Sequence, residues 1–298
     1  MSTGEKAVNA HVWSTPTGGD VKVFDRWSWR AWLGVRFWEH GFDRPVGEGL
    51  LVTAYALDSQ GAPQTSVFSV RARPNPEGVY VFHTLPRAGG AAGPPGAGAG
   101  AVAVEVRDPR GRFLPVVYVT DDPLNDSSLF LTAGSAIDPG AEEPRFYLFS
   151  SPARRVSPRA AAVVRAQLWD RTAARPAAYA VLEVSWDEQV WYGLADERGS
   201  ALVAFPYPPA PPSPSGAAPR GLYEQRWELE ARVRYQGGGD PLPALPGFGL
   251  PELGAIAGQP YAGIVPTEEG SPTDSITFSL AYGRETTLRT GGESVLWV

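Results

Sequence analysis

The stretch 161–208 constrains the fold most strongly, because it holds three apolar runs of strand length separated by short polar breaks. The breaks carry Asp, Arg and Gly, and Asp can bond its own backbone two residues on while Gly accepts a positive φ without a Cβ clash. The runs are rich in Val, Leu, Tyr and Trp, which suit a half-buried pleated surface. The pattern predicts a β-meander. Two breaks lie between the runs, at 170–175 and 186–189, and a third lies within the last run, at 196–199.

An earlier part of the chain repeats this pattern. Trp38 is followed by an acid and then by Pro45, and Trp169 is followed by an acid and then by Pro176, at the same interval of seven residues. A strand-like run follows each Pro, and the later runs 78–86 and 199–206 also correspond. We therefore expect two copies of one β-module, because repeats are a primary guide to architecture. The alternative is a chance likeness between two short β-rich stretches.

Composition supports strands and long loops. The chain has 34 Gly and 30 Pro among its 298 residues, and both residue types disfavour helix interiors. A hydrophobic content of 43% is sufficient for a packed core. The net charge of −6 argues against a general nucleic-acid binder, which needs a basic face.

The compartment is inferred from cysteine use and from the N-terminus. The chain has no Cys, which excludes disulfides, thiolate catalysis and Cys-ligated zinc and favours the cytoplasm. No signal peptide is visible in the first residues, and no stretch approaches the roughly 20 apolar residues of a membrane span. We expect a cytoplasmic protein without a membrane span, which lysis could release as part of an assembled particle.

The second copy resembles the carboxypeptidase regulatory-like modules, which are small transthyretin-like sandwiches. The resemblance rests on Arg175 and Pro176, the turn from Asp196 to Gly199, and the run 202–206. In the first copy the equivalent turn lies within 74–78 and lacks the Asp. The resemblance implies an all-β fold of two tandem immunoglobulin-like or transthyretin-like β-sandwich domains with long Gly/Pro-rich loops and extended terminal arms. The expected boundaries are an N-terminal arm at 1–23, sandwich domain one at 24–135, a connector at 136–160, sandwich domain two at 161–235, and a Gly/Pro-rich segment with C-terminal strands at 236–298, docking on domain two or on a partner.

Two terminal segments carry candidate interface residues. Residues 24–38 hold four of the ten tryptophans, and apolar side chains at odd positions predict a strand, with a helix as the alternative. Trp and Arg are enriched at binding hot spots, although ordinary core packing would use the same residues. The apolar C-terminus either adds a strand to the protein's own sandwich or lies on a partner. The candidate interface residues are Trp27, Trp29, Arg30, Trp32, Trp297 and Val298.

The chemistry-bearing residues do not form a catalytic or metal motif. The three His residues are far apart, and no HxH, HxxxH or HExxH spacing occurs. No Gly-x-Ser-x-Gly elbow supplies a nucleophile. The oxygen-rich run 121–126 fits either a calcium loop or ordinary Asx turns, and it lacks helix–loop–helix calcium spacing. We therefore expect no enzyme activity, no cofactor and no metal site, and the family that the chain resembles is generally non-catalytic.

Short runs at 78–86, 193–199, 282–285 and 288–290 are also similar to proteins encoded within phage-tail-like contractile injection systems. This similarity implies a structural component of such a particle, either a baseplate, a cap or a sheath-associated subunit. Its partners would be other protein subunits, including further copies of this chain. The alternative function is an extracellular recognition module that binds carbohydrate or a surface protein through loops and exposed tryptophans.

Overall fold

The computed structural model describes residues 33–58, 60–63, 69–83, 101–120, 146–210, 221–237 and 242–298. Strands dominate this part of the chain, and its α-helical content is one short helix, α1 (Leu253–Ala257). The predicted all-β sandwich class is therefore confirmed. Within the described ranges, no helix has the length and apolarity needed to cross a membrane.

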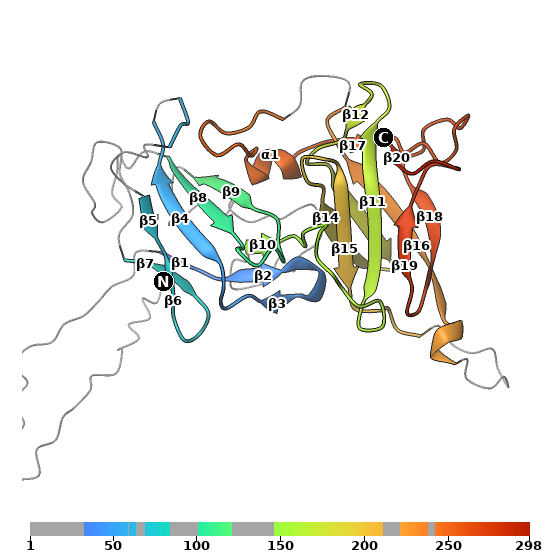
Figure 1. The fold of residues 1–298 in the computed structure, drawn as a ribbon, viewed down its shortest axis with the longest axis horizontal. Coiled ribbons are helices and arrows are strands. Elements are labelled where there is room, and N and C mark those ends of the chain that lie inside the picture. The colour runs from blue at the N-terminus through green and yellow to red at the C-terminus, as the bar shows by residue number, and fades with distance from the viewer. Residues whose placement is uncertain are drawn as a thin grey trace, which may run out of the picture.

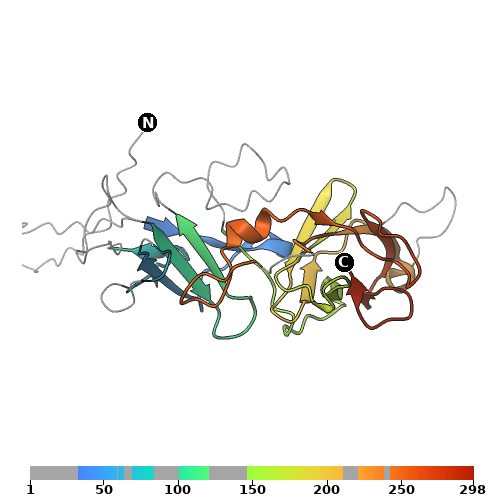
Figure 2. The same cartoon turned by 90° about the horizontal axis from the view of Figure 1, so that it is seen from above.

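The strands form two groups that lie side by side (Figures 1 and 2). The N-terminal group has a sheet of order β5-β4-β8-β9 and two small sheets, β1-β7-β6 and β10-β2-β3. Its alternating strand β4 buries every second residue, as expected of a strand with one face on a core. The bounds are β1 (Leu33–Val35), β2 (Phe37–Glu39), β3 (Arg44–Pro45), β4 (Leu51–Ala56), β5 (Ser69–Arg71), β6 (Arg73–Pro74), β7 (Tyr80–Phe82), β8 (Val102–Arg107), β9 (Val116–Thr120) and β10 (Phe146–Leu148).

The C-terminal group has two sheets. One has the order β12-β11-β15, with β19 and β20 also paired to β11, and the other has the order β14-β13-β16-β17, with β18 also paired to β16. The bounds are β11 (Ala162–Asp170), β12 (Arg175–Pro176), β13 (Val181–Trp186), β14 (Gln189–Leu194), β15 (Ser200–Phe205), β16 (Arg226–Arg234), β17 (Tyr261–Ala262), β18 (Ile276–Ala281), β19 (Glu285–Leu288) and β20 (Leu296–Trp297).

The strands of 161–208 exist, but the predicted meander is wrong. β13 and β14 pair as neighbours, whereas β11 pairs with β15 in the other sheet. Side chains of both sheets, including those of Leu168 and Leu182, meet in one buried cluster. Dividing successive strands between two facing sheets buries apolar faces that a single meander would leave in water.

The registers confirm that the two Trp–Pro hairpins are equivalent. Trp38 lies opposite Pro45 in the β2–β3 pair, and Trp169 lies opposite Pro176 in the β11–β12 pair. A second equivalence was not predicted. In the N-terminal group β10 pairs in parallel with β2, and in the C-terminal group β20 pairs in parallel with β11. In each group, therefore, the last strand pairs in parallel with the first strand of the Trp–Pro hairpin.

The Asx-x-x-Gly turn recurs in both groups with the same bonds. The Asp196 carboxylate accepts the N–H groups of Arg198 and Ser200, both at 2.9 Å. The side chain of Asn75 accepts the N–H groups of Glu77 at 3.0 Å and Val79 at 2.8 Å. Asn75 therefore performs the role of the Asp that the first copy lacks, since an Asn side-chain oxygen accepts the same bonds.

Gly199 is required in the second of these turns. Its φ is +77°, which side chains other than Gly rarely adopt. A Cβ at this position would lie 2.3 Å from the carbonyl oxygen of Leu168. The turn therefore packs directly on the opening strand of the C-terminal group.

One expected boundary needs correction. The expected connector 136–160 contains β10, which pairs with β2 of the N-terminal group. The Gly/Pro-rich segment expected from 236 contains α1 and β17. Strand β16 begins at Arg226, after the 3-10 turn Leu222–Glu224, and its odd residues are buried.

The two groups share a buried core. Val181, Tyr192 and Leu194 of the C-terminal group join the same cluster as the strands of the N-terminal group. Leu253 and Ile256 of α1 complete the cluster, and the glutamate that caps α1, Glu252, accepts the N–H of Ala255 at 2.7 Å. The apolar face of α1 therefore packs where the two groups meet, which is also its position in Figure 1.

Candidate protein-interaction site

The described residues with the features of a binding surface gather at one end of the C-terminal group. Tyr207 follows β15, Tyr223 lies in the 3-10 turn before β16, and Tyr282 follows β18. The ring centroids of Tyr207 and Tyr282 are 4.7 Å apart, and those of Tyr223 and Tyr282 are 5.9 Å apart in an edge-to-face arrangement. We call these three residues the tyrosine cluster. At such distances the attraction between aromatic rings adds to the free energy gained by burying their apolar surface.

Hydrogen bonds hold the inner part of the cluster in place. The hydroxyl of Tyr207 donates to the carbonyl of Pro158 at 2.5 Å and accepts the N–H of Gly283 at 2.9 Å. The hydroxyl of Tyr282 donates to the carbonyl of Arg159 at 3.3 Å. Burial raises the pKa of Tyr207, so this hydroxyl stays protonated at neutral pH. The rings are therefore oriented before any partner arrives.

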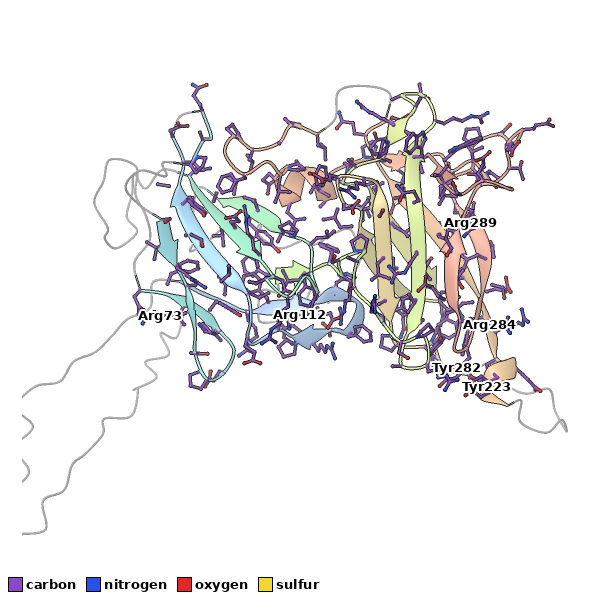
Figure 3. The ribbon with its side chains drawn as sticks, viewed as in Figure 1. Arg73, Arg112, Tyr223, Tyr282, Arg284 and Arg289 are labelled. Atoms are coloured by element: carbon purple, nitrogen blue, oxygen red, sulfur yellow. The ribbon has the colours of Figure 1, made fainter. Side chains whose placement is uncertain are left out.

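The outer part of the cluster faces solvent. Tyr223 is 70% exposed, the highest value among the large hydrophobic side chains of the described ranges. Three exposed arginines belong to the same end: Arg159 accepts the Tyr282 hydroxyl at its carbonyl, Arg226 lies opposite Ala281 in the β16–β18 pair, and Arg284 follows Tyr282 by two residues. Figure 3 shows Tyr223, Tyr282 and Arg284 close together. Tyr and Arg are the residue types that most often dominate binding energy at protein interfaces. The arrangement is suited to recognition of a macromolecular surface.

A pocket lies between the two groups, away from the tyrosine cluster. Its volume is about 360 Å³, and residues from β9, from the end of β14 and from the segment that leads into α1 line it. Most of the lining is apolar, with Leu114, Val116 and Leu194 among its side chains. The turn at 196–198 supplies its charged residues. This volume falls within the usual range for binding pockets.

The sequence candidates at the C-terminus take part in the protein's own sheet. Trp297 lies opposite Trp169 in the β20–β11 pair, and Val298 donates its N–H to the carbonyl of Trp169 at 2.9 Å. The guanidinium of Arg171 lies 4.8 Å from the centre of the Trp297 ring. Of the two alternatives for this segment, the structure therefore shows the strand added to the protein's own sandwich.

The remaining sequence candidates lie outside the described residues. These are Trp27, Trp29, Arg30 and Trp32, together with the oxygen-rich run 121–126. Where the same N-terminal segment enters the described part, the predicted alternation holds, because Val35 and Phe37 are buried. In the described ranges, no group of three or more His, Cys, Asp or Glu side chains could hold a metal ion.

Two polar side chains have partners within the fold. Glu39 of β2 forms ion pairs with Arg44 of β3 and with Arg154, which follows β10. His40 contacts the rings of Tyr147 and Tyr192, each at 5.0 Å between centroids, and its Nδ1 accepts the N–H of Tyr192 at 3.4 Å. These contacts join elements of the fold, and we assign them a structural role.

Sequence reasoning missed the tyrosine cluster because its members are far apart in the chain. Tyr207, Tyr223 and Tyr282 belong to three different turns, and only tertiary folding brings those turns to one end. A lone Tyr beside a turn is an ordinary half-buried residue and gives no pattern. In the sequence, the residues after β18 show only a similarity to proteins of contractile injection systems and give no sign of an aromatic cluster.

Comparison with protein-family models, curated proteins and solved structures found no match to this chain.

Proposed function

We propose that this protein is a non-catalytic structural subunit that binds neighbouring proteins through the tyrosine cluster and the arginines around it. The observation that carries the proposal is the 70% exposure of Tyr223 beside pre-oriented Tyr207 and Tyr282. Burial of this ring by a partner would remove apolar surface from water and so favour binding. Exposed Arg159, Arg226 and Arg284 add donors that can pair with carboxylates or carbonyls of such a partner.

The assembly that we propose is a phage-tail-like contractile injection particle, with this protein as a baseplate, cap or sheath-associated component. Support comes from the similarity of its short sequence runs to proteins of such systems. A continuous core between the two strand groups adds support, because a subunit under mechanical load benefits from modules that do not move independently.

Carbohydrate recognition is the alternative, and the geometry of the cluster favours it less. A sugar ring stacks on an open aromatic face, and neighbouring sugars need rings that share a plane. The planes of Tyr223 and Tyr282 meet at 74°, so the two rings do not form such a platform. Edge-to-face rings flanked by arginines are better suited to an irregular protein surface.

The proposal is tested by co-expressing the full chain with the products of neighbouring genes and measuring the affinity of the complex that co-purifies. Tyr223→Ala and Arg284→Ala should each weaken binding at least tenfold, as expected for hot-spot residues. Tyr261→Ala is the matched control, because Tyr261 is also exposed, at 50%, but lies on β17 away from the cluster. Unchanged affinity in both cluster variants, or binding to immobilised polysaccharide that Tyr223→Ala abolishes, would contradict the proposal.

A further inference from the structure

The pocket between the two strand groups has a largely apolar lining. Pro115 and Val116 on the β9 side, Leu194 of β14, Leu250 before α1 and Ile256 of α1 contribute to it. A cavity of about 360 Å³ is large enough for a bulky aromatic side chain with part of its backbone. Burial of such a side chain would remove apolar surface from water on both partners.

The rim of this pocket is negative on balance. Asp196 and Glu197 face one opposite charge, Arg198, in the same turn. The carboxylate of Asp196 is held in place by two backbone N–H groups, so its charge stays at the rim. Tyr179, which also lines the pocket, has a raised pKa because of burial first and then because of the charges of Glu197 and Asp196. A ligand with aromatic anchors and positive charges would complement this site.

One segment of the chain has this chemistry. Residues 24–32 read Phe-Asp-Arg-Trp-Ser-Trp-Arg-Ala-Trp, so that three tryptophans stand next to or close to Arg26 and Arg30. The segment lies outside the described residues and directly precedes β1. Trp and Arg are the side chains that bind most strongly when a pocket desolvates them.

The direction of the chain favours a second copy as the source of this segment. β1 and β2 run toward the junction of the two groups, where His40, directly after β2, contacts Tyr192 of β14. β1 lies at the remote end of this run (Figure 1). The chain therefore enters β1 on the side of the molecule away from the pocket, which favours a second copy as the source of the segment.

We propose that the pocket beside β9, β14 and α1 receives a tryptophan of segment 24–32 from a second copy of this chain, with Arg26 and Arg30 paired to the acidic rim. The contact is heterologous, since the segment and the pocket are different surfaces, so repetition of it produces a ring or a filament. Such self-association is separate from the binding of other subunits through the tyrosine cluster.

The test uses the full chain and measures self-association by sedimentation velocity over a range of concentrations. The chain should form oligomers, and a synthetic peptide of residues 22–33 should dissociate them, whereas the same peptide with its three Trp residues changed to Ala should not. Glu197→Lys should weaken self-association about three- to tenfold, as expected for reversal of one exposed charge pair. Because Glu197 is exposed in its turn, this variant should fold normally.

A charge exchange tests the pairing itself. Arg26→Glu with Arg30→Glu should also weaken self-association, and combining these changes with Glu197→Lys should recover part of the loss. Tyr223→Ala is the control that distinguishes this inference from the proposed function, since it should leave self-association unchanged. A chain that stays monomeric at all concentrations, an intact peptide without effect, or equal self-association of Glu197→Lys and the unaltered chain would overturn the inference.

Discussion

Two buried acids illustrate how equivalent residues acquire different partners. Glu39 and Asp170 occupy corresponding places after Trp38 and Trp169, and both are almost fully buried. Glu39 is neutralised by arginine side chains, whereas the Asp170 carboxylate accepts the hydroxyl of Tyr235 at 3.2 Å and the N–H of Ala173 at 2.8 Å. A buried carboxylate must be paired or hydrogen-bonded, and each copy meets this requirement with the groups that its own surroundings supply.

His40 gives a prediction at the same scale. Burial among aromatic rings lowers its pKa from 6.5 to about 4, with only partial opposition from Asp43. Between these values the unfolded chain binds a proton that the folded chain does not. Above pH 6.5 His40 is neutral in both states, and the free energy of unfolding has its full value. As the pH falls from about 6.5 to about 4, proton binding to the unfolded chain lowers that free energy.

The measurement is urea unfolding of the full chain at several pH values, compared with the variant His40→Gln. Over this pH interval the free energy of unfolding should fall more steeply for the unaltered protein than for the variant, because the variant lacks the imidazole. Carboxylates titrate in both proteins, so their effects on stability cancel in the comparison. Parallel stability curves for the two proteins would show that His40 is not held neutral by the fold.

At the scale of elements, the closing strands explain how each group seals its core. β10 and β20 are only three and two residues long, yet each adds a parallel partner to the first strand of the Trp–Pro hairpin of its group. Leu148 and Leu296 are fully buried at these positions. Strands this short have little stability alone. The burial of their side chains must therefore supply most of the stability that they add to the protein.

Leu296→Ala should therefore lower the free energy of unfolding by about 2–4 kcal/mol, the usual cost of a cavity left by a buried leucine. The measurement is urea unfolding at neutral pH. Ser294→Ala is a matched control, since Ser294 is exposed two residues earlier, and its effect should stay within about 0.5 kcal/mol. Equal stability of the Leu296→Ala variant and the control would mean that β20 does not contribute to the core.

At the scale of the whole molecule, the shared cluster links the two strand groups energetically. Val181, Tyr192 and Leu194 pack with the N-terminal strands, and Leu253 and Ile256 pack across the same junction. Exposing this surface by unfolding one group alone would cost the hydrophobic free energy of every side chain in the junction. The two groups should therefore unfold together.

Differential scanning calorimetry of the full chain is expected to show one transition, in which the calorimetric and van't Hoff enthalpies agree. Leu253→Ala should lower its midpoint by several degrees, as expected for loss of a buried leucine, without dividing the transition. Two resolved transitions in the unaltered protein would contradict energetic linkage of the groups.

Local sequence signals predicted much of the backbone. The alternation in β16, the turn at 196–199 and the equivalence of the two Trp–Pro hairpins all appear in the structure, because each depends on residues that are close in the chain. Short-range pattern determines which residues can be extended and where the chain must reverse. In these places the sequence by itself determined both the type and the position of the element.

Pairing between distant segments was decided only by the tertiary structure. β11 receives β15, β19 and β20, and β10 joins β2, although nothing local in these segments marks the partner. The tyrosine cluster and the pocket arise in the same way, from turns and strand ends that become neighbours when the sheets face each other. The sequence determined strands and turns through local backbone preference, whereas the burial of shared apolar faces selected their partners and so created both surfaces.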